Sequence, residues 1–142
     1  MIQWDTSALV KCYAALEKGH ARARNLLLRE RGHKGSVLLW PEAVSGIVRK
    51  LSTDRRVRES LLALLKGHLK HFDLLPVDQA QLELAVKLIC KHRLRSADAI
   101  HLAGALLLAR DLGRARLRFA TADIPQAAAA RAEGLKVVEL KE

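Results

Sequence analysis

Four acidic residues spread along the chain are the strongest candidates for chemistry. They are Asp5, Glu42, Asp98 and Asp123. Carboxylates brought close together repel one another, and some take up protons unless a cation neutralises them. A hard divalent ion such as Mg²⁺ or Mn²⁺ prefers oxygen ligands and binds through carboxylates together with substrate phosphates. As a group, the acids therefore predict a metal centre that activates water against a phosphate ester.

Each acid also has an ordinary structural explanation. An acid in the first turn of a helix, where Glu42 and Asp98 are predicted to lie, is stabilised by the helix dipole by about 0.3–1 kcal/mol. Asp123 follows Thr121 and Ala122 and could serve as a turn or cap residue. The metal interpretation therefore depends on all four acids meeting in the folded chain.

An α/β fold would bring these acids together. Short apolar segments alternate with longer helical ones, which predicts a three-layer α/β/α sandwich with a mainly parallel central sheet. Strands are expected at residues 2–4, 36–40, 74–77, 117–120 and 136–140. Helices are expected at residues 7–18, 21–31, 41–51, 55–71, 79–92, 96–111 and 125–133. Such sheets bind ligands beyond the carboxyl ends of their strands, so the site is expected there.

The second strand and the helix caps are predicted from local signals. Val37, Leu38 and Leu39 form the continuous apolar run expected of a strand buried on both faces. A helix is expected to open at Pro41, because the missing N–H of a proline costs nothing in a first turn. Two later helices are expected to begin at caps, Asp78 and Ser96.

Composition and charge narrow the class of protein. The 142 residues suit one domain, residues 1–142, and half of them are hydrophobic. Residues 1–5 lack the features of a secretory signal. The most apolar stretch, residues 99–109, is shorter than a membrane span. We therefore expect a cytoplasmic protein without a membrane partner. The cysteines, Cys12 and Cys90, are expected to be buried and reduced.

Basic residues outnumber acidic ones and favour an anionic partner such as RNA. Lysine and arginine total 25 against 15 aspartate and glutamate, a net charge of +10. Lys91, Arg93 and Arg95 lead directly into Asp98 and are the preferred candidates for RNA contact. A second basic cluster lies within residues 49–58. Both clusters could instead be solvated surface.

Five segments, taken in order, resemble the motifs of PIN-domain nucleases, and in particular the VapC-type toxins of toxin–antitoxin pairs. They are residues 1–10, 41–44, 96–103, 119–123 and 132–138. The resemblance covers essentially the whole chain. It departs at Gln3-Trp4, where small apolar residues are more usual, and at Ile124-Pro125-Gln126, where a basic or polar turn followed by leucine is commoner.

The resemblance implies a PIN-like fold and a set of site residues. Asp5, Glu42, Asp98 and Asp123 would bind Mg²⁺ or Mn²⁺. The residues beside that metal site would be Ser7, Thr121 and His101. It also implies hydrolysis of RNA phosphodiester bonds by a metal-activated water, leaving 5′-phosphate and 3′-hydroxyl ends. A homodimer and a cognate antitoxin that inhibits the enzyme are further implied.

Three other functions compete with a toxin endoribonuclease. A catalytically inactive PIN-like RNA-binding module is disfavoured, because loss of one of the four acids would then be expected. A housekeeping RNA-processing nuclease would use the same chemistry. A phosphoacceptor signalling domain needs an acidic pair after the first strand, whereas Asp5 is followed by Thr6 and Ser7.

Overall fold

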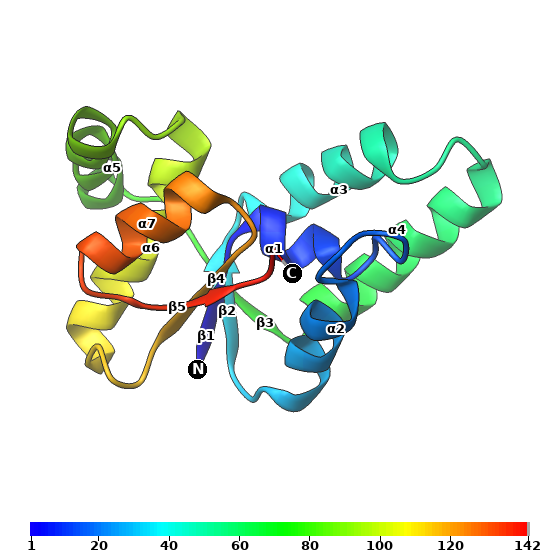
Figure 1. Ribbon diagram of the computed structural model, residues 1–142, viewed down its shortest axis with the longest axis horizontal. Coiled ribbons are helices and arrows are strands. Elements are labelled where there is room, and N and C mark those ends of the chain that lie inside the picture. Colours follow the sequence, from blue (N-terminus) through cyan, green and yellow to red (C-terminus); the bar gives the residue numbers. More distant parts are fainter. Residues whose placement is uncertain (142) are drawn as a thin grey trace.

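Five parallel strands form the centre of the computed structural model, which describes residues 1–141 (Figure 1). Their spatial order is β3-β2-β1-β4-β5, and every neighbouring pair is parallel. The strands are β1 (Ile2–Trp4), β2 (His33–Ser36), β3 (Phe72–Leu75), β4 (Arg118–Thr121) and β5 (Lys136–Glu139). The predicted parallel α/β sheet is therefore confirmed.

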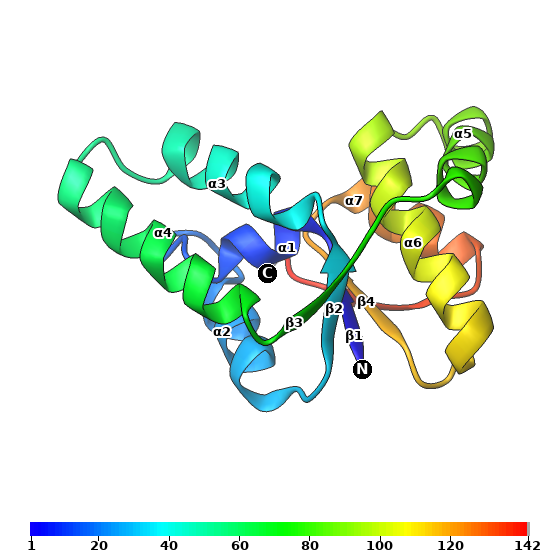
Figure 2. The ribbon, with the colours of Figure 1, turned by 180° about the vertical axis from the view of Figure 1, so that it is seen from behind.

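Helices cover both faces of this sheet and complete the three layers. They are α1 (Thr6–Lys11), α2 (His20–Arg29), α3 (Leu39–Lys50), α4 (Arg55–Leu69), α5 (Gln79–His92), α6 (Ser96–Leu112) and α7 (Ile124–Ala132). The first four helices lie on one side of the sheet and the last three on the other, as the two opposite views show (Figures 1 and 2). The α3–α4 pair projects away from the sheet as a helical hairpin.

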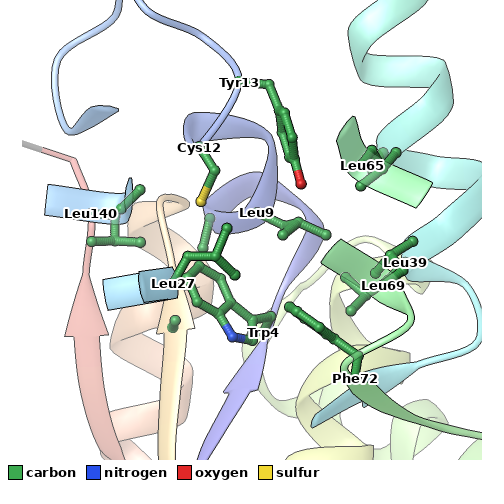
Figure 3. Close-up of a cluster of buried hydrophobic side chains, with 14 of the residues drawn as sticks. Trp4, Leu9, Cys12, Tyr13, Leu27, Leu39, Leu65, Leu69, Phe72 and Leu140 are labelled. Carbon is green, nitrogen blue, oxygen red and sulfur yellow. The ribbon is translucent and has the colours of Figure 1, made fainter. Parts of the chain in front are cut away.

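Each face of the sheet has its own hydrophobic core. Ile2 and Trp4 of β1 are fully buried in the cluster beneath α1 to α4 (Figure 3). Phe119 of β4 is buried in the other cluster, against Leu102 of α6. Ile2 and Trp4 lie two residues apart and therefore point to the same face of the sheet, since successive side chains of a strand alternate between its faces.

The second strand lies earlier in the chain than the sequence predicted. β2 ends at Ser36, and α3 begins at Leu39, so the predicted strand at residues 36–40 is wrong. Ser36 Oγ accepts a hydrogen bond from the N–H of Leu38 (3.1 Å), and the chain turns there. A Cβ at Gly35 would collide with the buried side chain of Leu39, so the glycine leaves room for Leu39 at the start of α3.

The first helix is shorter than predicted, because it ends at Lys11 and not near residue 18. The next three residues, Cys12, Tyr13 and Ala14, are all at least 96% buried, at relative exposures of 2%, 4% and 4%. Three successive residues cannot all lie on one buried helix face. The chain therefore leaves the helix and turns so that all three are buried. Figure 3 shows Cys12 and Tyr13 in the core.

The remaining predicted elements are present with slightly shifted ends. Asp78 caps α5 as expected, through a hydrogen bond from the N–H of Gln81 (2.8 Å). Ser96 is not a cap, because it is the first residue of α6 and Arg95 holds the cap position. Cys12 is buried as predicted, but Cys90 is exposed on α5, so its predicted burial is wrong. Among residues 1–141, no helix is both long and apolar enough to cross a membrane.

Candidate active site

The direction of the chain reverses around β1 and β4, at the centre of the sheet. β1 leads through α1 and α2 to its neighbour β2, whereas the chain from β3 returns to β4 on the other side of β1. Open parallel sheets bind ligands beyond the carboxyl ends of the strands at such a reversal. Asp5 follows β1 directly, and Thr121 is the last residue of β4.

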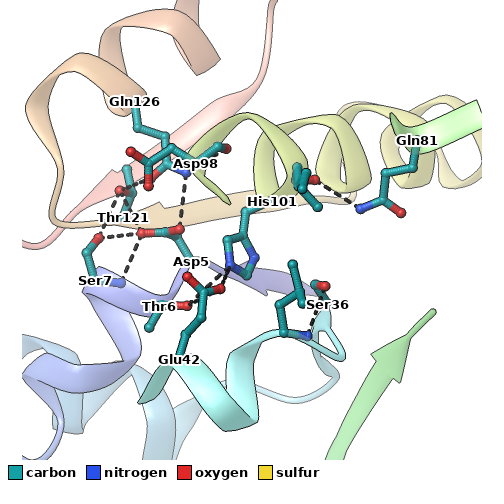
Figure 4. Close-up of polar contacts among 12 residues, drawn as sticks. Asp5, Thr6, Ser7, Ser36, Glu42, Gln81, Asp98, His101, Thr121 and Gln126 are labelled. Carbon is teal, nitrogen blue, oxygen red and sulfur yellow. Dashed lines mark hydrogen bonds and ion pairs between the residues drawn. The ribbon is translucent and has the colours of Figure 1, made fainter. Parts of the chain in front are cut away.

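A cavity of about 640 Å³ lies at this position and collects all four predicted acids. Asp5 and Asp123 reach it from the ends of β1 and β4. Glu42 and Asp98 reach it from the first turns of α3 and α6. Elements far apart in the sequence therefore bring the four acids to one place. Figure 4 shows three of them, Asp5, Glu42 and Asp98.

Asp5 is the buried centre of the site and is held by several donors. The residue is 1% exposed, and its Oδ2 accepts hydrogen bonds from the backbone N–H (3.0 Å) and the hydroxyl (2.5 Å) of Ser7. Ser7 Oγ in turn accepts from the N–H of Ala122 (2.9 Å) and lies 3.2 Å from Thr121 Oγ1. Ser7 and Thr121, the two hydroxyl residues predicted from the sequence, thus both lie next to Asp5 (Figure 4).

Glu42 is held by His101, whose ring is fully buried in α6. The Nε2 of His101 lies 2.6 Å from Glu42 Oε1, and the Thr6 hydroxyl donates to the same oxygen (3.2 Å). Burial lowers the pKa of His101, but the hydrogen bond to Glu42 and the nearby charges of Asp5, Glu42 and Asp98 raise the net pKa above its ordinary value. His101 therefore orients Glu42.

The pKa of Asp98 is raised, as is expected for a carboxyl group close to other acids. Burial, followed by the charges of Asp5 and Asp123, raises the pKa of Asp98 to about 6, although Arg95 and His101 oppose the shift. A neighbouring cation would reverse this shift, because it favours the ionised carboxylate. The raised pKa of Asp98 thus comes first from burial and second from the neighbouring acids.

Asp123 combines the cap role and the cavity position that the sequence left as alternatives. Its Oδ1 accepts a hydrogen bond from the N–H of Gln126 (2.8 Å) and caps α7. Its side chain also lines the cavity. The backbone N–H of Asp123 donates to Thr121 Oγ1 (3.1 Å), which fixes the turn after β4.

The donor set suits a hard divalent ion, although the side chains do not form a finished cage. Four carboxylates supply oxygen ligands, which Mg²⁺ and Mn²⁺ prefer. Within residues 1–141, no three aspartate, glutamate, histidine or cysteine side chains are arranged so that they could hold one metal ion directly. An ion in this cavity would therefore bind through water molecules or after side-chain rotation, as is common for Mg²⁺, which keeps several waters.

Basic residues surround the acids and include one of the three predicted from the sequence. Those that line the cavity are Lys11, Arg49, Lys50 and Arg95. Lys91 and Arg93 are not among the lining residues. Lys91 forms an ion pair with Glu133 (2.7 Å), and Arg93 ends α5 in a left-handed backbone conformation (φ 56°).

Sequence reasoning overlooked Gln126 as a site residue. Its side chain is fully buried and hydrogen-bonds to Asp5, to Thr121 and to the backbone carbonyl of Asp98 (Figure 4). The available signal was a glutamine three residues after the cap Asp123, where glutamine normally reaches back to the cap's own N–H. That pattern predicts a local capping role and gives no hint of contacts across the site.

Comparison with known proteins identifies relatives of this chain. Residues 3–112 match the model of the PIN domain. Ribonuclease VapC46 of Mycobacterium tuberculosis is 37% identical over 114 residues, which cover 80% of each chain. The crystal structure of FitAcB from Neisseria gonorrhoeae superimposes with a TM-score of 0.69 at 20% identity, covering 100% of this chain and 99% of that one.

A second solved structure, VapC20 of Mycobacterium tuberculosis, described as a sarcin-ricin loop cleaving toxin, gives a TM-score of 0.68 at 19% identity. The match covers 91% of this chain and 95% of that one. At such low identities, the solved structures show the fold that this chain shares with them.

Proposed function

Because the chain belongs to the PIN-domain family, we propose that it is a metal-dependent endoribonuclease and the toxin of a toxin–antitoxin pair. The observation that carries the proposal is that all four acids, contributed by four separate elements, line one cavity. The relative named a ribonuclease supports RNA as the substrate. The full set of acids disfavours an inactive binding module, and nothing in the site favours a housekeeping nuclease.

Asp5, Glu42, Asp98 and Asp123 would hold Mg²⁺ or Mn²⁺. Such an ion would supply an activated water and would neutralise charge on the scissile phosphate. The chain's own task is orientation. Ser7 holds Asp5 in place through two hydrogen bonds, Thr121 lies beside Ser7, and His101 holds Glu42. These contacts keep the acids facing the cavity before substrate arrives.

The basic lining of the cavity would bind the RNA backbone while the acids hold the metal. Arg49 and Lys50 end α3, Arg95 precedes α6, and each is exposed as well as lining the cavity. Lys91 and Arg93 are exposed beyond the cavity, where they would extend the contact with RNA. Phosphate contacts of this kind release counterions, so binding should weaken as salt concentration rises.

An antitoxin and a second copy of the chain are the proposed protein partners. Structural neighbours include a toxin–antitoxin complex from Klebsiella pneumoniae, which supports the antitoxin. The projecting α3–α4 hairpin carries the exposed apolar residues Val48, Val57 and Leu64, which suit a protein contact. We further propose that residues 1–142 act as one domain, since both cores share a single sheet. The proposed location is the cytoplasm.

The test is cleavage of mixed cellular RNA by purified protein freed of any antitoxin. We expect cleavage with Mg²⁺ or Mn²⁺, none with EDTA, and recovery when metal is restored. The new ends should be 5′-phosphates and 3′-hydroxyls. Cleavage that persists unchanged in EDTA would contradict a metal-dependent nuclease.

A further inference from the structure

The buried amide of Gln126 joins three parts of the site that come from different elements. Its Nε2 donates to Asp5 Oδ1 (3.1 Å) after β1 and to the backbone carbonyl of Asp98 (3.0 Å) in α6. Its Oε1 accepts from the hydroxyl of Thr121 (2.6 Å) at the end of β4. All the hydrogen-bonding atoms of this side chain therefore point into the site, and the side chain itself is 0% exposed.

The orientation of this amide follows from its partners. A backbone carbonyl only accepts hydrogen bonds, so the group facing the carbonyl of Asp98 must be the NH₂ of Gln126. The same NH₂ then faces Asp5, and the amide oxygen must face Thr121. Since the amide oxygen only accepts hydrogen bonds, the hydroxyl of Thr121 must donate its single proton to Gln126.

The direction of the neighbouring hydrogen bonds then follows. With its proton committed, Thr121 Oγ1 can only accept, which it does from the N–H of Asp123. The hydroxyl of Ser7 therefore donates its proton to Asp5 Oδ2, and the two oxygens are 2.5 Å apart. Asp5 thus receives three donors, one from Gln126 and two from Ser7, and a carboxylate has about four acceptor positions. About one position remains free, and it is available to a ligand in the cavity.

We propose that Gln126 is a positioning residue of the metal site, which holds Asp5 in a single orientation and leaves one carboxylate lone pair for the ion. This inference rests on the metal-binding role proposed above for Asp5. It assigns Gln126 a role beyond the helix cap that its spacing from Asp123 suggests. Residues that orient metal ligands typically change metal affinity by about 10–100-fold when they are replaced.

Gln81 provides a matched control for the structural part of this role. It is also a buried glutamine (6% exposed), and its Nε2 also donates to a backbone carbonyl of α6, that of Ile100 (2.9 Å). It does not line the cavity that holds the acids. Gln126→Met and Gln81→Met therefore each remove a hydrogen bond between a buried side-chain amide and a backbone carbonyl of α6. Only Gln126→Met also removes a hydrogen bond to Asp5.

The experiment measures Mn²⁺ affinity by calorimetry and thermal unfolding in EDTA, both on the full chain without RNA. We expect Gln126→Met to weaken Mn²⁺ binding by about 10–100-fold and Gln81→Met to leave it within about threefold, while both lower thermal stability. Equal affinities for Gln126→Met and wild type, or equal losses in the two variants, would overturn the proposal.

A second variant tests the same hydrogen-bond chain without altering Gln126. Thr121→Val removes the proton given to Gln126, so Mn²⁺ binding should again weaken. Wild-type affinity in that variant would contradict the inferred chain. Failure of wild type itself to bind Mn²⁺ would overturn both this proposal and the metal centre. Normal Mn²⁺ binding without RNA cleavage would instead contradict only the proposed ribonuclease function.

Discussion

At the scale of single residues, the cavity is lined by the four acids and by basic side chains. Arg49, in the last turn of α3, lines the cavity beside the acids and is exposed to solvent. A phosphate bound there would lie near both the arginine and a metal ion held by the acids.

Arg49→Gln should weaken RNA binding and reduce its salt dependence. One lost phosphate contact should lower the slope of log K against log salt by about 0.7 for a single strand. Fluorescence anisotropy with labelled RNA, in an Asp98→Asn background to prevent cleavage, measures this slope. Arg29→Gln, on the exposed surface of α2 and outside the cavity lining, is the control. Identical slopes for the two variants would contradict a phosphate contact at Arg49.

Sequence reasoning found the four acids of the cavity because their signals are local. Asp5 directly follows a strand, Glu42 and Asp98 lie in the first turns of helices, and Asp123 is a helix cap. These positions can be recognised without knowing the partners of each residue. Gln126 was missed because its contacts are made with residues up to 121 positions away in the chain. The same limit applies to Lys91, whose ion pair with Glu133 joins α5 to the residue that ends α7.

At the scale of elements, the turn from β2 into α3 places Glu42 at the cavity. Gly35 permits this turn, because a side chain there would collide with the buried Leu39. Glu42 lies in the first turn of the helix that follows. Displacing the start of α3 would therefore move Glu42 away from His101.

Gly35→Ala should destabilise the protein by about 1–3 kcal/mol, the usual cost of overpacking a core. Gly67→Ala is the matched control on α4, where nothing lies within 4 Å of the added carbon. It should stabilise the exposed helix by about 0.5–1 kcal/mol. Chemical denaturation of both variants gives the two free energies of unfolding. Stability of Gly35→Ala equal to or above that of wild type would be inconsistent with the close approach of Leu39.

The same turn shows why this element was misassigned from the sequence. The apolar run of residues 37–39 resembles a buried strand, yet Val37 is 42% exposed and Trp40, just beyond it, is 48% exposed. The true strand, His33–Ser36, contains histidine, lysine, glycine and serine, and so carries no apolar pattern. It is held as a strand by its two parallel neighbours, β1 and β3, which a local pattern cannot reveal.

At the scale of the whole molecule, stability is expected to depend on neutral histidines far from the acids. His33 and His68 line a cavity of about 360 Å³ at the amino end of the sheet, and Trp4 Nε1 donates to His33 Nδ1 (3.1 Å). Burial lowers the pKa of both histidines below the ordinary value of 6.5, and the charge of His71 adds to the effect. The folded protein therefore favours their neutral rings.

The sign of the pH effect follows from this shift. Above pH 6.5, His33 is neutral in both the folded and the unfolded chain, and its full contribution to stability is present. Below pH 6.5, the histidine binds a proton more readily in the unfolded chain than in the folded one, so stability falls. Acid should thus remove the contribution of His33. His33→Asn keeps an acceptor for Trp4 but does not titrate, so its Tm should fall less than that of wild type between pH 8 and pH 5. Parallel Tm profiles for the two proteins would refute this.

The most direct test of the account compares two substitutions in α6. Asp98→Asn removes one carboxylate from the cavity, whereas Asp111→Asn makes the same change on the exposed surface near the end of that helix. The measurement is the rate of RNA cleavage at saturating Mn²⁺, with equal Tm values as the control for folding. Since a catalytic ion contributes several kcal/mol, we predict a loss of at least ~100-fold for Asp98→Asn and an unchanged rate for Asp111→Asn. Equal cleavage by both variants would contradict an active site built on these acids.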